Sequence, residues 1–172
     1  MSGANDRKPG ALRWLWLAAA VIVADQLTKA LIVIGLELYE VVDVLPVLEI
    51  TRLHNTGAAF SLLADASGWQ RWFFVGLATA VSAGIVYWLR NLPRDSAAFL
   101  PAALALVMGG ALGNLVDRIW HGHVVDFLHF HWGAAYFPAF NVADSCITVG
   151  AGLLILDALL EGRRKRPAGA GP

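Results

Sequence analysis

Four long apolar runs dominate the pattern of hydrophobic and polar positions along the chain. They cover roughly residues 14–35, 69–90, 97–120 and 140–160. A helix needs about 20 mostly apolar residues to cross the hydrocarbon core of a bilayer, and each run is long enough. We therefore predict four transmembrane helices within one membrane domain that takes in residues 1–172.

Two of the connections between these runs are long and carry a strand pattern. They cover residues 36–68 and 121–139, and the first contains alternating and β-branched stretches at 39–44 and 48–53. Stretches of this kind are typical of β-strands. The pattern predicts an all-α membrane protein with a small extracytoplasmic β-rich element between its first and second helices, resting at the membrane surface.

Basic residues favour one side of the predicted membrane. Nine of the 13 Lys and Arg residues precede the first run, separate the second from the third, or follow the fourth. These nine are Arg7, Lys8, Arg13, Arg90, Arg94, Arg163, Arg164, Lys165 and Arg166. Because cytoplasmic segments carry an excess of basic residues, we expect both termini to be cytoplasmic.

The composition agrees with a bilayer protein and argues against other classes. Hydrophobic residues make up 58% of the chain and charged residues 15%, which leaves too little polar surface to cover a soluble core. The 13 basic and 13 acidic residues balance, so no net positive field would gather nucleic-acid phosphates. The single cysteine, Cys146, cannot form an internal disulfide, and we expect it to serve packing.

Polar residues inside the apolar runs cluster at one depth. A charged side chain inside a span costs about 2.5–3.5 kcal/mol on insertion scales, so each needs a reason to be there. When successive helices alternate in direction, these residues fall in the outer half of the bilayer. They are Asp25, Lys29, Asn114, Asp117, Arg118, Asn141 and Asp144. The pattern predicts one shared polar site near the outer surface, without revealing its reaction.

Helical spacing pairs several of these residues. Asp25 and Lys29 are four apart and share one helical face, which predicts an ion pair that either only fixes helix packing or supports a site. Asn114 and Arg118 also share a face. Arg118 could snorkel to the interface, or it could clamp a carboxylate or a backbone carbonyl.

Two aspartates are candidates for catalysis. Asp126 follows the third run in an apolar setting that speaks against an exposed loop, and Asp144 lies one turn into the fourth run. Two carboxylates at low dielectric cannot both ionise readily, so one keeps a proton while the other acts as a base. Such a pair can activate water and protonate a leaving amine. It could therefore hydrolyse an amide without a metal or a nucleophilic side chain, and we expect no cofactor.

Other kinds of chemistry are less well supported. His121, His123, His129 and His131 resemble a metal cluster, but no HExxH motif or cysteine pair accompanies them, and their spacing fits a strand or loop. No serine lies in a GxSxG elbow. A proton-coupled transporter would need polar residues through both halves of the bilayer, and the cytoplasmic halves of these runs lack them. A noncatalytic assembly or lipid-binding protein would need its carboxylates only to neutralise basic residues.

Five motifs follow one another along the chain. They are DQLTK at 25–29, NTGAAFS at 55–61, GGALGNLVDR at 109–118, VVDF at 124–127 and FNVAD at 140–144. In this order they resemble the bacterial lipoprotein signal peptidase family, also called signal peptidase II. The resemblance covers essentially the whole chain.

The resemblance implies an aspartic endopeptidase that crosses the bacterial inner membrane several times, with its active site facing the periplasm. Its partners would be membrane lipids and prolipoproteins whose cysteine carries a diacylglyceryl group. The signal peptide would be removed on the amino side of that cysteine. We expect a monomer that binds no nucleic acid.

The resemblance also assigns roles to individual positions. Asp126 and Asp144 match the catalytic pair. The residues that match its polar surroundings and supporting pair are Asn55, Asn114, Arg118, Asn141, Asp25 and Lys29. We expect Asn55 to bind the substrate backbone, Gly57 to allow a conformation that other residues resist, and the 36–68 connection to act as a lid.

Overall fold

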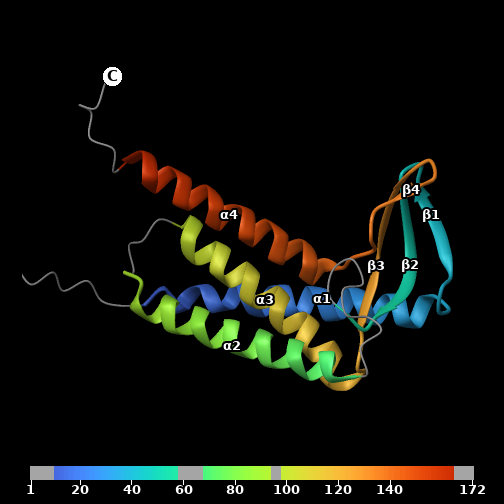
Figure 1. Cartoon of the computed structure of the whole chain (residues 1–172), viewed down its shortest axis with the longest axis horizontal. Helices are drawn as coiled ribbons and strands as arrows, with labels where there is room; N and C mark the ends of the chain where they lie inside the picture. Colours follow the sequence, from blue (N-terminus) through green and yellow to red (C-terminus); the bar gives the residue numbers. More distant parts are fainter. Residues whose placement is uncertain (1–9, 58–67, 94–97, 165–172) are drawn as a thin grey trace, which may run out of the picture.

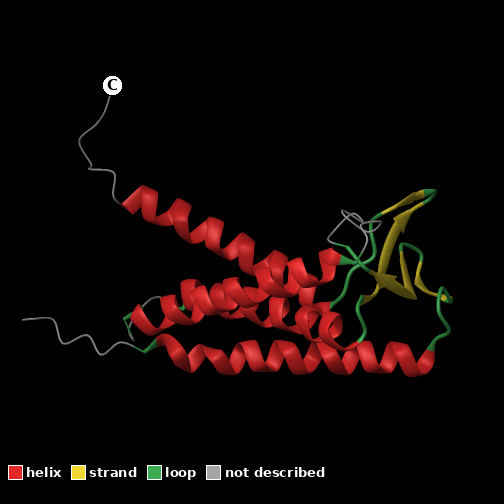
Figure 2. Cartoon of the chain, turned by 60° about the horizontal axis from the view of Figure 1, so that its bottom comes forward, coloured by secondary structure: helices red, strands yellow, loops and turns green. Residues whose placement is uncertain are grey.

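In the computed structural model, four long helices and a small sheet make up the described residues, which are 10–57, 68–93 and 98–164 (Figures 1 and 2). The helices are α1 (Leu15–Gly35), α2 (Trp69–Asn91), α3 (Phe99–Trp120) and α4 (Val142–Arg164), and a short 3-10 turn, η1 (Ala11–Trp14), precedes α1. Each long helix is apolar and long enough to cross a membrane. This confirms the four predicted spans.

The fourth helix begins two residues later than the pattern predicted, for a reason visible in the backbone. Phe140 is still extended and exchanges backbone hydrogen bonds with Leu128 of strand β3 (Val124–Trp132). Asn141 then caps the helix, because its side-chain oxygen accepts the Asp144 N–H at 2.9 Å. The chain therefore passes from sheet to helix within a single residue.

The sheet is antiparallel and draws on both long connections. Its strand order is β1-β2-β3-β4, where β1 is Val41–Leu45, β2 is Leu48–Asn55 and β4 is Ala135–Tyr136. The predicted β-element between the first two helices is confirmed by β1 and β2. Strands β3 and β4 lie between α3 and α4 and extend it, because the free edge of β2 pairs with β3.

Several predictions fall on residues outside the described ranges. The candidate lid includes residues 58–67, which also carry the second half of the NTGAAFS motif, and the basic residues concerned are Arg7, Lys8, Arg94, Lys165 and Arg166. The described helix ends can still be compared with the prediction that both termini lie on one side of the membrane. The start of α1 and the end of α4 lie at the same end of the bundle, opposite the sheet (Figure 1).

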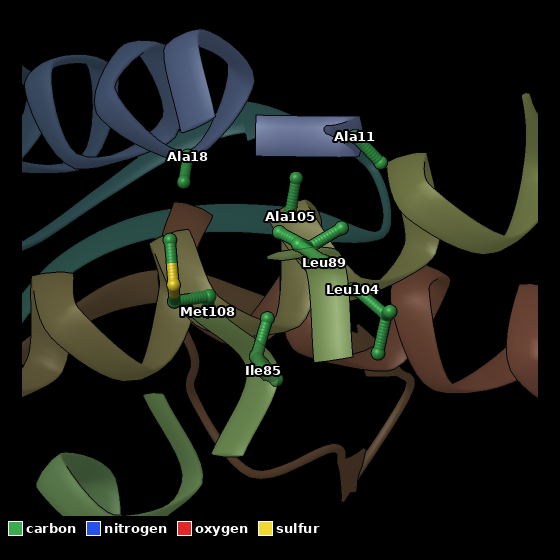
Figure 3. Packing of buried hydrophobic residues seen from close by; sticks show 7 residues of the cluster. All are labelled: Ala11, Ala18, Ile85, Leu89, Leu104, Ala105 and Met108. Carbon is green, nitrogen blue, oxygen red and sulfur yellow. The ribbon is translucent and has the colours of Figure 1, made fainter. Parts of the chain in front are cut away.

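Helix α3 is the centre of the bundle and contacts α1, α2 and α4. At the end away from the sheet it closes an apolar cluster with η1, α1 and α2, in which Leu89 and Ala105 are fully buried (Figure 3). The cluster consists of Ala11, Ala18, Ile85, Leu89, Leu104, Ala105 and Met108. Helix α4 diverges from the other helices toward its C-terminal end (Figure 2).

Glycines in the middle of α3 allow its neighbours to approach closely. A Cβ atom built on Gly109 would lie 2.8 Å from the Val21 Cβ of α1, and one built on Gly110 would collide with the Ala143 carbonyl of α4. Small residues of this kind let helix backbones pack closely in lipid. The close approach brings α1 and α4 against the same stretch of α3.

This packing predicts the effect of adding one methyl group. Gly110→Ala should lower the free energy of unfolding by about 1–3 kcal/mol, because the new Cβ overlaps backbone that cannot move freely. Gly152→Ala, at an exposed position of α4, is the control, since nothing lies within 4 Å of its Cβ position. Thermal unfolding in detergent, followed by tryptophan fluorescence, would measure both. Equal melting temperatures would contradict the packing argument.

Candidate active site

Asp126 lies in the middle of a buried stretch of β3. Its neighbours Val124, Val125 and Phe127 are at most 5% exposed, and Asp126 itself is 3% exposed. The carboxylate accepts hydrogen bonds from two amide groups, Asn55 Nδ2 to Oδ2 at 2.9 Å and Asn141 Nδ2 to Oδ1 at 2.7 Å. The apolar flanks seen in the sequence thus indicate burial correctly.

Asp144 lies in the first turn of α4 and is held from two sides. Asn114 of α3 donates from Nδ2 to Asp144 Oδ1 at 2.8 Å, and the backbone N–H of Asn141 donates to Oδ2 at 3.3 Å. Each of the four carboxylate oxygens of Asp126 and Asp144 therefore accepts an N–H from a neutral group.

Asn141 joins the two aspartates directly. It is fully buried, its Nδ2 donates to Asp126, and its Oδ1 accepts the backbone N–H of Asp144. Since the amide nitrogen can only donate and the oxygen only accept, these contacts determine how the amide is turned. Together with its backbone N–H, which donates to the Asp144 carboxylate, Asn141 thereby contacts both carboxyl groups.

Burial changes the acidity of Asp126. Burial, first of all, and the negative charge of Asp144 raise its pKa to about 7, although hydrogen bonds from Asn55 and Asn141 and the charge of Lys29 work against this rise. A carboxyl group with a pKa near 7 can carry a proton at neutral pH. The arrangement can thus present one acid and one base together.

The predicted ion pair on α1 is present, and its lysine also contacts two residues of α3. Lys29 Nζ lies 2.8 Å from Asp25 Oδ2 and 2.9 Å from Asp117 Oδ2, and it donates to Asn114 Oδ1 at 2.8 Å. Because the ammonium takes the oxygen of Asn114, the amide nitrogen of Asn114 is left to face Asp144. The lysine is thus linked to the catalytic candidate through one amide.

The two carboxylates beside Lys29 hold the backbone next to the aspartate pair. Asp25 Oδ1 accepts the N–H of Ala143 at 2.9 Å, and Asp117 Oδ2 accepts the N–H of Val125 at 3.1 Å. Ala143 and Val125 each precede one of the two aspartates. Both supporting carboxylates therefore position the peptide unit that carries a candidate catalytic residue.

Sequence reasoning did not assign this role to Asp117, nor any role to Gln26. Gln26 donates to Asp117 Oδ1 at 2.8 Å and to the Gly113 carbonyl at 3.2 Å. A signal for Asp117 existed, because it lies three residues after Asn114 and so on an adjoining helical face. Its partners on α1 and β3 come from the tertiary structure.

Arg118 clamps a backbone carbonyl, which is one of the alternatives its position allowed. Its Nη2 donates to the Gly57 carbonyl at 2.9 Å, and its guanidinium lies 4.9 Å from the centre of the Phe74 ring. Asn55 Oδ1 accepts the Gly57 N–H at 3.0 Å. Arg118 and Asn55 together hold the end of β2 and the residues just after it.

A cleft of about 600 Å³ opens beside these residues. Its polar lining comes from Asn55, Gly57, Asn114, Arg118, Asp144, Ser145 and Thr148, and its apolar lining from Val124, Phe137, Pro138, Ala139, Phe140, Ile147 and Val149. Asp126 does not line the cleft, but its partner Asn55 does. The cleft can receive a ligand that has both a polar backbone and apolar groups.

The four histidines between α3 and β4 do not gather in one place. His123 stacks on His54 with ring centroids 3.7 Å apart, whereas His129 Nδ1 and His131 Nε2 lie 3.3 and 3.6 Å from the carboxylate of Glu49. Within the described ranges, no three His, Cys, Asp or Glu side chains are arranged to hold a metal ion. The histidines form two separate clusters.

Known proteins resemble this chain over most of its length. A protein of Shewanella woodyi named "Lipoprotein signal peptidase" is 53% identical over 152 residues, which is 88% of this chain and 86% of that protein. A protein of the same name from Alteromonas mediterranea is 48% identical over 90% of this chain and 84% of its own length.

Solved structures agree with the sequence relatives. One described as "Bacterial membrane enzyme structure by the in meso method at 2.3 A resolution" has a TM-score of 0.79 and 31% identity, covering 92% of this chain and 94% of that one. A second, at 1.9 Å, has a TM-score of 0.75 and 32% identity over 89% of this chain and 97% of its own. Both solved structures share the fold of this chain over nearly its whole length.

The family whose sequence pattern matches is described as "Signal peptidase (SPase) II", and the match covers residues 17–160. This range contains all nine residues that the sequence singled out as site residues, and the structure brings them together. With its four membrane-length helices, the chain belongs to the signal peptidase II family, the multi-pass aspartic endopeptidases that process bacterial prolipoproteins.

Proposed function

We propose that Asp126 and Asp144 are the catalytic pair, which cleaves the peptide bond on the amino side of a diacylglyceryl-modified cysteine. The observation that carries this proposal is the contact of both carboxyl groups with Asn141. It places the buried carboxyl group of Asp126 and the partly buried one of Asp144 around one residue, next to a cleft that Asp144 lines. Ser145 also lines the cleft, but its hydroxyl donates to the backbone carbonyl of Asn141 and not to a base.

The pair would share one proton in the resting enzyme. The ionised carboxylate takes a proton from a water molecule, whose oxygen attacks the scissile carbonyl carbon, while the protonated carboxyl group donates its proton to the carbonyl oxygen. The tetrahedral intermediate collapses when its C–N bond breaks and the leaving amine takes up a proton from the pair. No covalent bond to the protein forms, and the raised pKa of Asp126 supports a shared proton at neutral pH.

The lining of the cleft suits a lipid-modified peptide. Asn55, Gly57 and Arg118 offer polar groups to the substrate backbone, and Phe137, Phe140 and neighbouring residues supply apolar lining. Apolar walls with a few convergent polar groups are usual for ligand sites. The lipid chains of the substrate could stay in the bilayer while its backbone meets the aspartates.

We also propose that the enzyme lies in the inner membrane with both termini in the cytoplasm and its active site facing the periplasm. The basic residues near the ends of the spans support this orientation, since positive charge collects on the cytoplasmic side. The site is built from α1, β2, β3, α3 and α4 of one chain. A monomer consisting of one domain would therefore be sufficient for activity.

The charge balance around Lys29 gives this residue a supporting role in the proposal. Two carboxylates, Asp25 and Asp117, face one ammonium, and the side chains of all three are at most 4% exposed. Without the ammonium, two buried negative charges would repel each other. Since these carboxylates hold Ala143 and Val125, the damage would spread to the peptide units that carry the aspartate pair.

The central experiment measures cleavage of a diacylglyceryl-modified prolipoprotein by the purified enzyme. Asp126→Asn and Asp144→Asn should each lower turnover by roughly 10²–10⁴-fold, because an amide can neither accept nor release the required proton. Asp43→Asn is the matched control, an exposed aspartate of β1 that should leave turnover unchanged. Near-normal turnover by either site variant would refute the assignment of the pair.

The raised pKa of Asp126 predicts the pH dependence of turnover. The shared proton is lost as pH rises through about 7, so kcat should fall on the alkaline side of that value. Asn55→Ala removes a hydrogen bond that holds this pKa down, so the alkaline limb should move to higher pH. The profile of kcat against pH measures both effects. A limb that moves to lower pH in Asn55→Ala would contradict the prediction.

Two substitutions around Lys29 should differ in their cost to stability. Lys29→Met leaves two unpaired buried carboxylates and should lower the free energy of unfolding by about 3–5 kcal/mol. Asp117→Asn leaves the Lys29–Asp25 pair intact and should cost less. Chemical unfolding in detergent micelles would compare the variants. If Asp117→Asn cost as much as Lys29→Met, the balance of charge would not be what stabilises this cluster.

A further inference from the structure

Two histidines that the mechanism does not use stack on each other at the catalytic end of the sheet. His54 belongs to β2, and His123 directly precedes β3. Their ring centroids are 3.7 Å apart with an interplanar angle of 22°, and both side chains are partly exposed. This stack joins the last residues of β2 to the first residues of β3.

The stack lies on the face of the strand pair opposite to Asp126. His54 pairs with Val125, and Asn55 pairs with Val124, so neighbouring side chains point to opposite faces. On one face, Asn55 reaches diagonally to Asp126 at 2.9 Å. On the other, His54 reaches diagonally to His123. The two diagonal contacts therefore join the same short stretch of paired β2 and β3 residues from its two faces.

This piece of ladder is separated from the rest of the sheet. The register of β2 and β3 shifts between Ile50 and Leu53, which leaves only three pairs beyond the irregularity. They are Leu53 with Asp126, His54 with Val125 and Asn55 with Val124. Few backbone pairs therefore hold Asn55 against Asp126, and the imidazole stack is a contact between the same strand ends.

The surroundings of the stack oppose a positive charge. Burial lowers the pKa of His54, as do the nearby charges of Arg52 and His121, and burial, His54 and His121 lower the pKa of His123. Asp117 of α3 acts in the opposite direction on His123, but it is already paired with Lys29. Arg71 of α2 lies against Gly122, at the turn that carries His123. Both rings are therefore favoured in the neutral form.

We propose that the His54–His123 stack is a pH-sensitive clamp that positions Asn55 against Asp126, and that its protonation opens the ladder and lowers activity. The inference rests on the proposed role of Asp126 in catalysis. The two histidines are positioning residues, since they touch neither aspartate. A lowered pKa in the folded state means that the clamp contributes fully above the ordinary value for histidine, about 6.5, and is lost as pH falls below it.

The test replaces both rings by an aromatic ring that cannot ionise. In the wild type, kcat/KM should fall roughly tenfold between about pH 7 and about pH 5, as the imidazoles protonate. The double variant His54→Phe with His123→Phe keeps an aromatic stack and should lose no more than about twofold over the same range. The acid limb of the aspartate pair is common to both proteins and cancels in the comparison.

Two further variants separate the clamp from general stability. His123→Ala removes the stack and should lower kcat/KM already at neutral pH, with a weaker dependence on pH than the wild type. His131→Phe changes a histidine at the far end of β3 and should keep the wild-type profile. Melting temperatures at both pH values show which variants are folded, and His123→Phe alone serves the same test if the double variant does not fold.

The outcome that overturns the clamp is an equal loss of activity at low pH in the wild type and in the phenylalanine variants. This failure is distinct from that of the proposed function. An active Asp126→Asn enzyme would overturn the catalytic pair, whereas an inactive Asp126→Asn enzyme together with unchanged pH profiles in the phenylalanine variants would overturn only the clamp.

Discussion

The ammonium group of Lys29 lies between two carboxylates and an amide, and the rest of the site depends on this contact. Inside a bilayer there is no water to satisfy buried polar groups, so each of them needs a partner within the protein. Lys29 neutralises Asp25 and Asp117 in part, and these in turn accept the N–H groups of Ala143 and Val125. A single charge on α1 thus connects α3, α4 and β3 next to the two candidate catalytic residues.

Among the described residues, the side chains that donate hydrogen bonds to the aspartate pair are neutral amides and not cations. Asn55, Asn114 and Asn141 donate to Asp126 and Asp144, while Lys29 stays one residue further away. A cation in direct contact with both carboxyl groups would favour their ionised forms and remove the shared proton. Neutral amide donors position the carboxyl groups and favour ionisation less than a cation would, which is consistent with the raised pKa of Asp126.

The bundle separates packing from chemistry along its length. At the end away from the sheet, apolar side chains from η1, α1, α2 and α3 form the cluster around Leu89. From the middle of α3 toward the sheet, glycines bring α1 and α4 close to α3, and Gly113 lies so near Asp25 that a Cβ atom there would be 2.7 Å from its carboxylate. Small residues therefore leave space for the polar network. Larger apolar residues would occupy this space.

The sequence alone predicted the membrane helices and most residues of the candidate site. Apolar runs of sufficient length specify spans regardless of what packs against them, and the cost of burying charge makes every polar residue inside a span a marker of function, as with Asp25, Lys29 and Asp144. Spacing of four residues also predicted the Asp25–Lys29 contact, because it depends on helix geometry alone. The ordered motifs pointed to the family.

Only the tertiary structure decided which polar groups meet. The pairing of β2 with β3, the extension of the sheet by the second connection and the role of Asp117 all depend on contacts between segments far apart in the chain. The same holds for Asn141, whose amide contacts Asp126 on β3 and Asp144 on α4. Local patterns report burial and helical faces, but they carry no information about register between distant strands, and the geometry of the aspartate pair depends on that register.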